Sequence, residues 1–104
     1  MSTTDHPEYG EVILASDLPG FLNDVPEWSV EGGEIRRAFK WKDFAEAMDF
    51  VNGVAELAEA ENHHPDIAIQ WNKVTLSLST HSKGGLTALD FELAQKIDLL
   101  AKGR

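Results

Sequence analysis

The spacing of apolar residues alternates along this chain between the period of a β-strand and that of an α-helix. Within residues 34–41, the apolar side chains Ile35, Phe39 and Trp41 lie an even number of positions apart, as in a strand with one buried face. Residues 44–58 then repeat them at i, i+3, i+4 and i+7, the stripe of an amphipathic helix. The predicted elements are strands at 28–30 and 34–41, a helix from 43 to about 62, strands at 67–71 and 74–79, and a helix from 87 to 102.

Local signals set the ends of these elements. Asp43 can cap the first long helix, and Pro65 ends it because proline cannot continue the hydrogen-bond ladder. The spacing of Thr87 and Asp90 is that of a capping box, which opens the last helix. The order β-β-α-β-β-α, with an open choice of turn or short helix at 17–23, predicts an α+β fold. We expect helices on one face of a four-stranded antiparallel sheet, with the other face free for a site or a partner.

The length of 104 residues fits one domain with a modest core, which favours association through an exposed sheet edge. Residues 1–10 are polar, so we expect a flexible lead-in followed by a single domain at 11–104. The N-terminus lacks the pattern of a signal peptide, and no run approaches the ~18 apolar residues of a membrane span. A cytoplasmic homo-oligomer that does not bind membranes is therefore expected.

Charge and cysteine content exclude several functions. Nine Lys and Arg against eighteen Asp and Glu give a formal net charge of −9, so nucleic-acid backbones and anionic lipids would be repelled. Cysteine is absent, which excludes disulfides, Cys-ligated metal sites and thiol catalysis. We expect no direct binding of nucleic acid.

Three of the four histidines fall at two places that the predicted topology can bring together. His63 and His64 lie at a helix-to-strand junction, and His81 follows the last strand, facing away from the core if that strand extends so far. Imidazole titrates near neutrality, which suits the addition or elimination of water without a cofactor. Glu59 lies one helical turn before His63, where a carboxylate could orient the ring.

Other interpretations of these residues stay open at this point. Paired histidines at a helix end can simply favour the helix dipole, and a histidine at a strand end can be a solvated surface residue. Three imidazoles with Glu59 or Asp66 could bind zinc, but adjacent histidines before a proline are hard to aim at one ion. Trp71 is a candidate wall of a site, although tryptophans in strands more often pack in a core or an interface.

A longer pattern runs from Glu59 to Asp90. An acidic residue is followed after three positions by His-His-Pro, then by an aromatic residue, by a histidine ten positions further on and by a later aspartate. This pattern resembles the signature of the pterin-4a-carbinolamine dehydratases, and segments 35–44, 71–74 and 85–87 are also similar to that family. The departures are a tryptophan at 71, where tyrosine or phenylalanine is frequent, and a two-glycine turn before Ile35. The positions that fill the pattern are Glu59, His63, His64, Pro65, Trp71, His81 and Asp90.

The resemblance implies the same α+β fold, assembled through sheet edges into homodimers or homotetramers. It implies a hydro-lyase that converts 4a-hydroxytetrahydropterin, such as 4a-hydroxytetrahydrobiopterin, to quinonoid dihydropterin and water. That reaction recycles tetrahydropterin for an aromatic amino acid hydroxylase, a possible pathway partner. No metal or organic cofactor is expected.

The resemblance also implies a role for each site residue. His63 and His81 resemble general acids that protonate the departing hydroxyl, and they could serve opposite stereoisomers of the substrate. His64 resembles a binding residue or base, and Glu59 would orient His63. For Asp90 we favour the structural role of a helix cap. The expected substrate-binding residues are Asn62, His63, His64, Trp71, Ser79, Thr80, His81 and Ser82.

A function of another class remains an alternative. Relatives of this fold act without catalysis, as a dimerisation coactivator for a homeodomain transcription factor or as assembly factors for a carbon-fixing enzyme. A scaffold has no chemical need to keep three histidines and Glu59 together, and this chain has all four. We therefore favour the enzyme.

Overall fold

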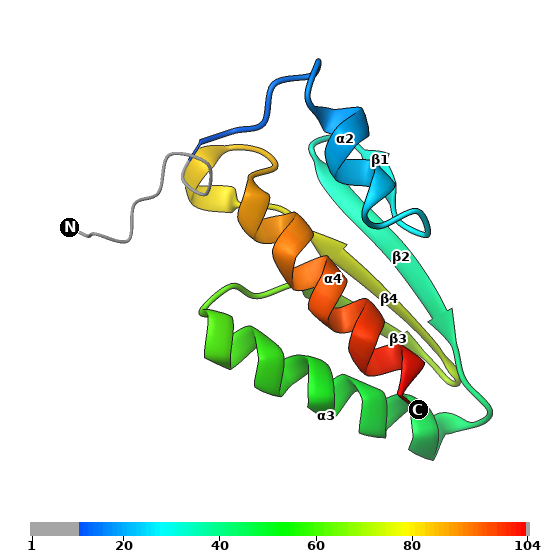
Figure 1. Cartoon of the computed structure of the whole chain (residues 1–104). Helices are drawn as coiled ribbons and strands as arrows, with labels where there is room; N and C mark the ends of the chain where they lie inside the picture. Colours follow the sequence, from blue (N-terminus) through cyan, green and yellow to red (C-terminus); the bar gives the residue numbers. More distant parts are fainter. Residues whose placement is uncertain (1–10, 104) are drawn as a thin grey trace.

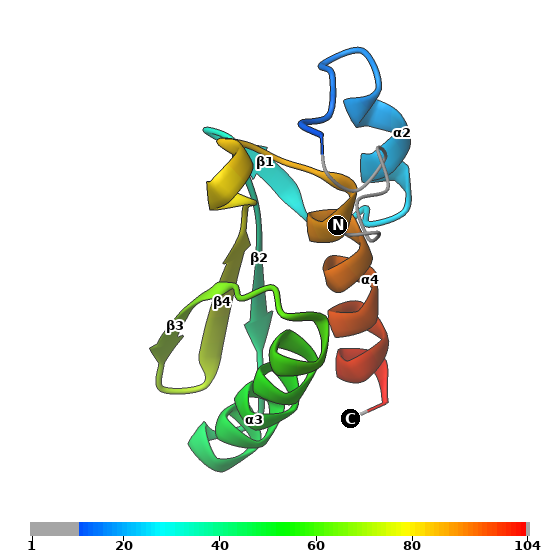
Figure 2. The same ribbon diagram turned by 90° about the vertical axis from the view of Figure 1, so that its left-hand side faces the viewer.

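The computed structural model describes residues 11–103, and the predicted lead-in at 1–10 lies outside that range. Four antiparallel strands form one sheet in the order β1-β2-β4-β3 (Figure 1). The α-helices lie on one side of this sheet (Figure 2), so the predicted α+β fold is confirmed. The elements are α2 (Leu18–Asn23), β1 (Ser29–Glu31), β2 (Glu34–Lys40), α3 (Phe44–Glu61), β3 (Asp66–Gln70), β4 (Lys73–Leu78), the 3₁₀ helix η1 (His81–Lys83) and α4 (Ala88–Lys102).

The core lies between the sheet and the two long helices. Phe50 of α3 is fully buried, with its ring centroid 4.8 Å from Phe39 of β2 and 4.7 Å from Trp41. Phe44, which begins the predicted stripe, is instead 50% exposed, so α3 is rotated relative to the expected face. The fully or nearly fully buried apolar residues of the sheet and of α3 and α4 include Ile35, Phe39, Val74, Leu76, Leu78, Ala47, Val54, Ala58, Phe91, Leu93, Ala94 and Ile97.

The segment at 17–23, left open by its sequence, contains a short helix. Its Phe21 packs on Phe91 of α4 with ring centroids 5.2 Å apart. This contact places α2 beside the N-terminal half of α4 (Figure 1). Burial of an aromatic pair compensates for the weak tendency of so short a segment to form a helix alone.

The end of α3 sets the direction of the chain toward β3. Asn62 adopts a left-handed conformation with φ 52°, and its backbone N–H donates to the backbone carbonyl of Glu59 over 3.3 Å. The amide of His63 then donates back to the carbonyl of Ala58 over 3.1 Å. These two bonds make a Schellman motif, which ends the helix and reverses the chain. His63 therefore no longer continues the helical spacing from Glu59.

The end of β4 also differs from expectation. The strand stops at Leu78, and Thr80 forms an isolated antiparallel bridge with Gly85 instead. Gly84, at φ 78°, allows the tight return that closes this loop. His81 is exposed as expected, but it begins the 3₁₀ helix η1 and does not continue the strand.

Candidate functional site

His63 is held against a buried carboxylate. Its Nε2 lies 2.5 Å from Oδ1 of Asp90, in the first turn of α4. The His63 side chain is 11% exposed and that of Asp90 is 0% exposed. A carboxylate at this distance fixes the tautomer and the orientation of an imidazole, because the carboxylate accepts a hydrogen bond and Nε2 must therefore carry the proton. Nδ1 is then the ring nitrogen left to face a ligand.

The second oxygen of Asp90 belongs to a buried hydrogen-bond network. Oδ2 accepts from the hydroxyl of Thr80 and from the backbone amide of Thr87, each over 2.9 Å. The predicted capping box of α4 is therefore present, and the same carboxylate also contacts His63. Asp90 joins the junction after α3, the end of β4 and the start of α4.

The carboxylates that contact His63 and His64 differ from those predicted. Glu59 was predicted to orient His63, but its Oε2 lies 2.6 Å from Nε2 of His64, and both of these side chains are largely exposed. The turn at Asn62 is the physical reason, because it ends the helical spacing that would have placed Glu59 beside His63. The residue that contacts His63 is Asp90. In the sequence, Asp90 was visible as a residue of the family pattern. Because it also lies at a capping position, the sequence favoured a purely structural role for it.

The segment after β4 comes to the same end of the molecule. Thr80 is 6% exposed and its hydroxyl is used on Asp90, so its side chain faces inward and not toward a ligand. His81 and Ser82 follow directly on η1 and are exposed, and Ser79 is half-buried. The link through Thr80 and Asp90 thus joins the segments that carry His81 and His63. Asn62 is exposed as well, at the end of α3.

Trp71 lies apart from this group. It occupies the turn between β3 and β4, whereas His63 and His64 precede the other end of β3. A strand of this length separates the two ends by about 17 Å. Trp71 is 66% exposed and adopts a left-handed backbone with φ 54°. Within one chain, the structure does not bring it to the histidines.

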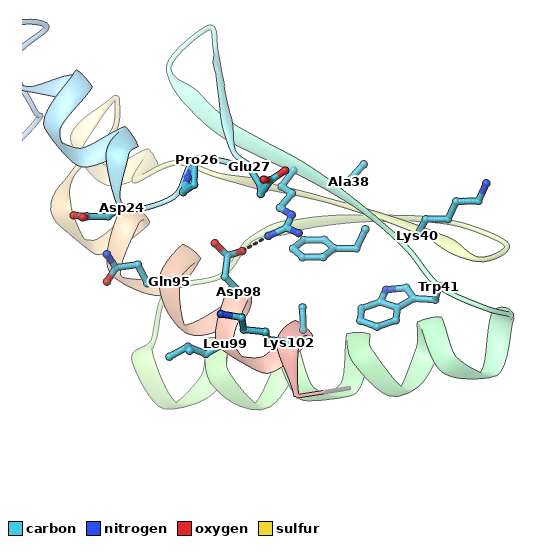
Figure 3. A pocket seen from close by; sticks show the side chains of 13 residues that line it. Asp24, Pro26, Glu27, Ala38, Lys40, Trp41, Gln95, Asp98, Leu99 and Lys102 are labelled. Atoms are coloured by element: carbon cyan, nitrogen blue, oxygen red, sulfur yellow. Dashed lines mark hydrogen bonds and ion pairs between the residues drawn. The ribbon is translucent and has the colours of Figure 1, made fainter.

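A cavity of about 760 Å³ opens on another part of the molecule (Figure 3). It lies between β2 and the C-terminal half of α4, where Arg37 pairs with Asp98 over 2.8 Å. Leu99 and Trp41 supply apolar lining. The predicted site residues, all within the described part of the chain, lie outside this cavity. The histidine group, which consists of His63, His64 and His81, therefore lies apart from this cavity.

Residues 11–103 contain no cluster of three or more His, Cys, Asp or Glu side chains arranged to hold a metal ion. Among the helices of that range, none combines the length and apolar character that crossing a bilayer requires.

Comparison with known proteins assigns the family. The model of the pterin 4 alpha carbinolamine dehydratases matches residues 14–100, which is most of the chain. The chain belongs to this family. The match spans every residue of the histidine group and the whole Asp90 network. The resemblance seen in the sequence is thereby confirmed.

Relatives of this pterin dehydratase family member come from distant organisms. A protein of Cyanothece sp., provisionally named a pterin-4-alpha-carbinolamine dehydratase, is 56% identical over 92 residues, covering 88% of this chain and 95% of the relative. One from Sulfurisphaera tokodaii with the same provisional name is 49% identical over 79 residues, covering 76% of this chain and 85% of its own.

Solved structures share the fold. A Brucella melitensis protein described as a transcriptional coactivator/pterin dehydratase superposes with a TM-score of 0.83 at 35% identity, covering 88% of this chain and 99% of its own. A pterin dehydratase-like protein described as a RuBisCO assembly factor in the alpha-carboxysome gives a TM-score of 0.63 at 23% identity, covering 72% and 89%. The second likeness concerns the fold alone. Proteins described by different functions therefore share this architecture.

Proposed function

We propose that this protein is a hydro-lyase that removes water from a 4a-hydroxytetrahydropterin to give quinonoid dihydropterin. The buried pair of His63 and Asp90 carries the proposal, because a histidine held by a carboxylate is the arrangement that directed proton transfer needs. Membership of the family supports the substrate class.

The chemistry requires one well-placed acid. In the carbinolamine, the lone pair of the ring nitrogen next to the hydroxyl-bearing carbon expels the hydroxyl group as the C–O bond breaks. A proton delivered to the departing oxygen makes it water, and a proton lost from a ring nitrogen completes the neutral product. Such general acid catalysis supplies a factor of about 10²–10⁴.

In His63, Nε2 faces Asp90, so the proton must come from Nδ1. The resting ring carries its proton on Nε2, and it becomes the acid when Nδ1 takes up a second proton from solvent. The resulting imidazolium is stabilised by the Asp90 carboxylate, and it returns to the neutral ring when Nδ1 gives its proton to the departing oxygen.

The remaining histidines complete the proposed site. His81 is exposed on η1 and would act as a second general acid, for the opposite face of the substrate. His64, paired with Glu59, would bind the pterin or accept the proton that leaves it. Backbone groups of Ser79, Ser82 and Asn62 would contact the ring. Trp71 is left out of this single-chain site because it lies at the far end of the hairpin.

We further propose that the protein acts in the cytoplasm as a homodimer or homotetramer, recycling tetrahydropterin for an aromatic amino acid hydroxylase. Features of the sheet support assembly. In residues 11–103, β1 pairs only with residues 34–36 of β2, and β3 forms the opposite edge of the sheet. Ile67 and Ile69 on β3 remain 38% and 37% exposed. Such edges favour pairing with another strand.

A binding role is the second candidate function. The Brucella melitensis protein, at 35% identity, is described by both a coactivator and a dehydratase name. A scaffold would not require the carboxylate of Asp90 on His63. A coactivator role could coexist with catalysis, and it would use surfaces other than the histidine group.

The proposal is tested by the decay of synthetic 4a-hydroxytetrahydropterin in a stopped-flow instrument. We expect the wild-type protein to accelerate water loss over buffer, and His63→Ala and His81→Ala each to reduce that acceleration roughly tenfold or more. Asp66→Asn, an exposed carboxylate at the start of β3, is the matched control and should keep the wild-type rate. A wild-type rate equal to buffer would exclude the enzyme and leave the binding role.

A further inference from the structure

The hydroxyls of two buried threonines form a chain that ends on Asp90. Thr80 Oγ1 lies 2.8 Å from Thr87 Oγ1 and donates to Asp90 Oδ2 over 2.9 Å. Thr80 is 6% exposed and Thr87 is 0% exposed. Buried hydroxyls need partners, and these two find them in each other and in the carboxylate.

The direction of this chain follows from counting protons. A hydroxyl has one proton to donate, and that of Thr80 goes to Asp90. The contact between the two hydroxyls must then be donated by Thr87, whose oxygen in turn accepts from the amide of Leu89 over 3.3 Å. Every bond therefore points toward the carboxylate.

We propose that Thr80 is a positioning residue for the dehydratase reaction, acting through Asp90 on His63. The Thr80 hydroxyl and the Thr87 amide together engage Oδ2, which leaves Oδ1 to accept from His63 Nε2. With Oδ2 held from two sides, the carboxylate cannot rotate away from the ring. The imidazole is thereby kept in the tautomer that has its proton on Nε2 and exposes Nδ1. This inference rests on the proposed function only for the rate, since the tautomer is a property of the free protein.

The test replaces the hydroxyl by a methyl group of similar size. Thr80→Val removes the donor, Thr80→Ser keeps it, and Thr75→Val is a matched control on β4 that lies outside the network. Nitrogen-15 spectra of the histidine rings report the tautomer of His63, and stopped-flow kinetics report kcat and KM. Urea denaturation verifies that each variant is folded.

We expect wild type, Thr80→Ser and Thr75→Val to show a single His63 tautomer with the proton on Nε2. Thr80→Val should show a mixture, with kcat lowered roughly 10-fold to 100-fold and KM nearly unchanged, because a misplaced catalytic group loses about that much. Unchanged His63 signals in Thr80→Val would overturn the role of Thr80, whatever happens to the rate. The dehydratase proposal is tested separately by the wild-type protein. A wild-type rate of water loss equal to that in buffer would contradict it.

A measurement on the wild-type protein covers the case in which Thr80→Val does not fold. The hydroxyl protons of Thr80 and Thr87 should exchange slowly with solvent and appear in proton spectra, because both are buried and bonded. Exchange of the Thr80 hydroxyl as fast as that of the half-buried Thr75 would contradict the proposed chain.

Discussion

At the scale of single residues, Asp90 serves two parts of the molecule with its two oxygens. Oδ2 closes the capping box of α4, and Oδ1 contacts His63. A buried carboxylate must be fully hydrogen-bonded, and loss of one bond costs about 1–3 kcal/mol. The residue that begins the last helix thus also orients the ring proposed for catalysis. Its substitution should affect stability and rate together.

A second residue-scale feature is the ion pair between Lys96 of α4 and Glu61, the last residue of α3. Lys96 Nζ lies 2.5 Å from Glu61 Oε2, and this hydrogen bond raises the pKa of Lys96 above its usual 10.5. A raised folded-state pKa stabilises the fold fully below about pH 10.5, and the gain is lost as the pH rises through the folded-state pKa. Lys96→Met should therefore lower the free energy of unfolding at pH 8, by less than about 1 kcal/mol for this partly exposed pair.

Urea denaturation of wild type and Lys96→Met between pH 8 and pH 11.5 measures this difference. It should shrink toward zero at the alkaline end. Lys73→Met, which removes an exposed lysine of β4, controls for the loss of one positive charge. A difference that grew with pH would contradict the assigned role of the pair.

Some residue roles were visible in the sequence and others were not. The spacing of Thr87 and Asp90 predicted the capping box, because a capping box is formed by two residues three positions apart. The contact between Asp90 and His63 joins residues 27 positions apart and depends on how α4 docks beside the end of α3. Glu59 was paired with the wrong histidine because helical spacing was extended past Asn62, where the helix ends.

At the scale of elements, the turn between β3 and β4 carries backbone strain. Trp71 has φ 54°, a conformation that costs a bulky residue about 1 kcal/mol, and 66% exposure means that little burial offsets it. Trp71→Gly should therefore raise the free energy of unfolding by roughly 0.5–1 kcal/mol. Gln70→Gly, one position earlier and inside β3, should lower it by a similar amount. A urea midpoint lowered equally in both variants would refute the strain.

Element types followed from apolar periodicity, whereas their ends and faces depended on tertiary contacts. Both hairpins lie where the apolar residues have the period of a strand, and both long helices lie where they have the period of a helix. The buried face of α3 includes Phe50 because its ring packs against two aromatic rings. These are Phe39 in β2 and Trp41, which directly follows β2. β4 stopped short because the bridge from Thr80 to Gly85 replaces strand pairing there.

At the scale of the whole molecule, the two ends of α4 have different surroundings. Its first turn contacts the histidine group, and its second half borders the 760 Å³ cavity beside β2. Periodicity predicted the layers of the fold. Trp71 was assigned to the site because of its aromatic ring and the family pattern, whereas the predicted strands at 67–71 and 74–79 already placed it at the opposite end of the hairpin from His63. That placement depends on the length of β3 and on where its turn falls.

The central claim is that Asp90 acts on the reaction through His63, and a double-variant cycle tests it most directly. The rate of water loss from 4a-hydroxytetrahydropterin is measured for wild type, His63→Ala, Asp90→Asn and the variant with both changes. If Asp90 works only by holding His63, the double variant should be no slower than His63→Ala, within about twofold. Losses that multiply in the double variant would contradict the account, because they would mean that the two residues act independently.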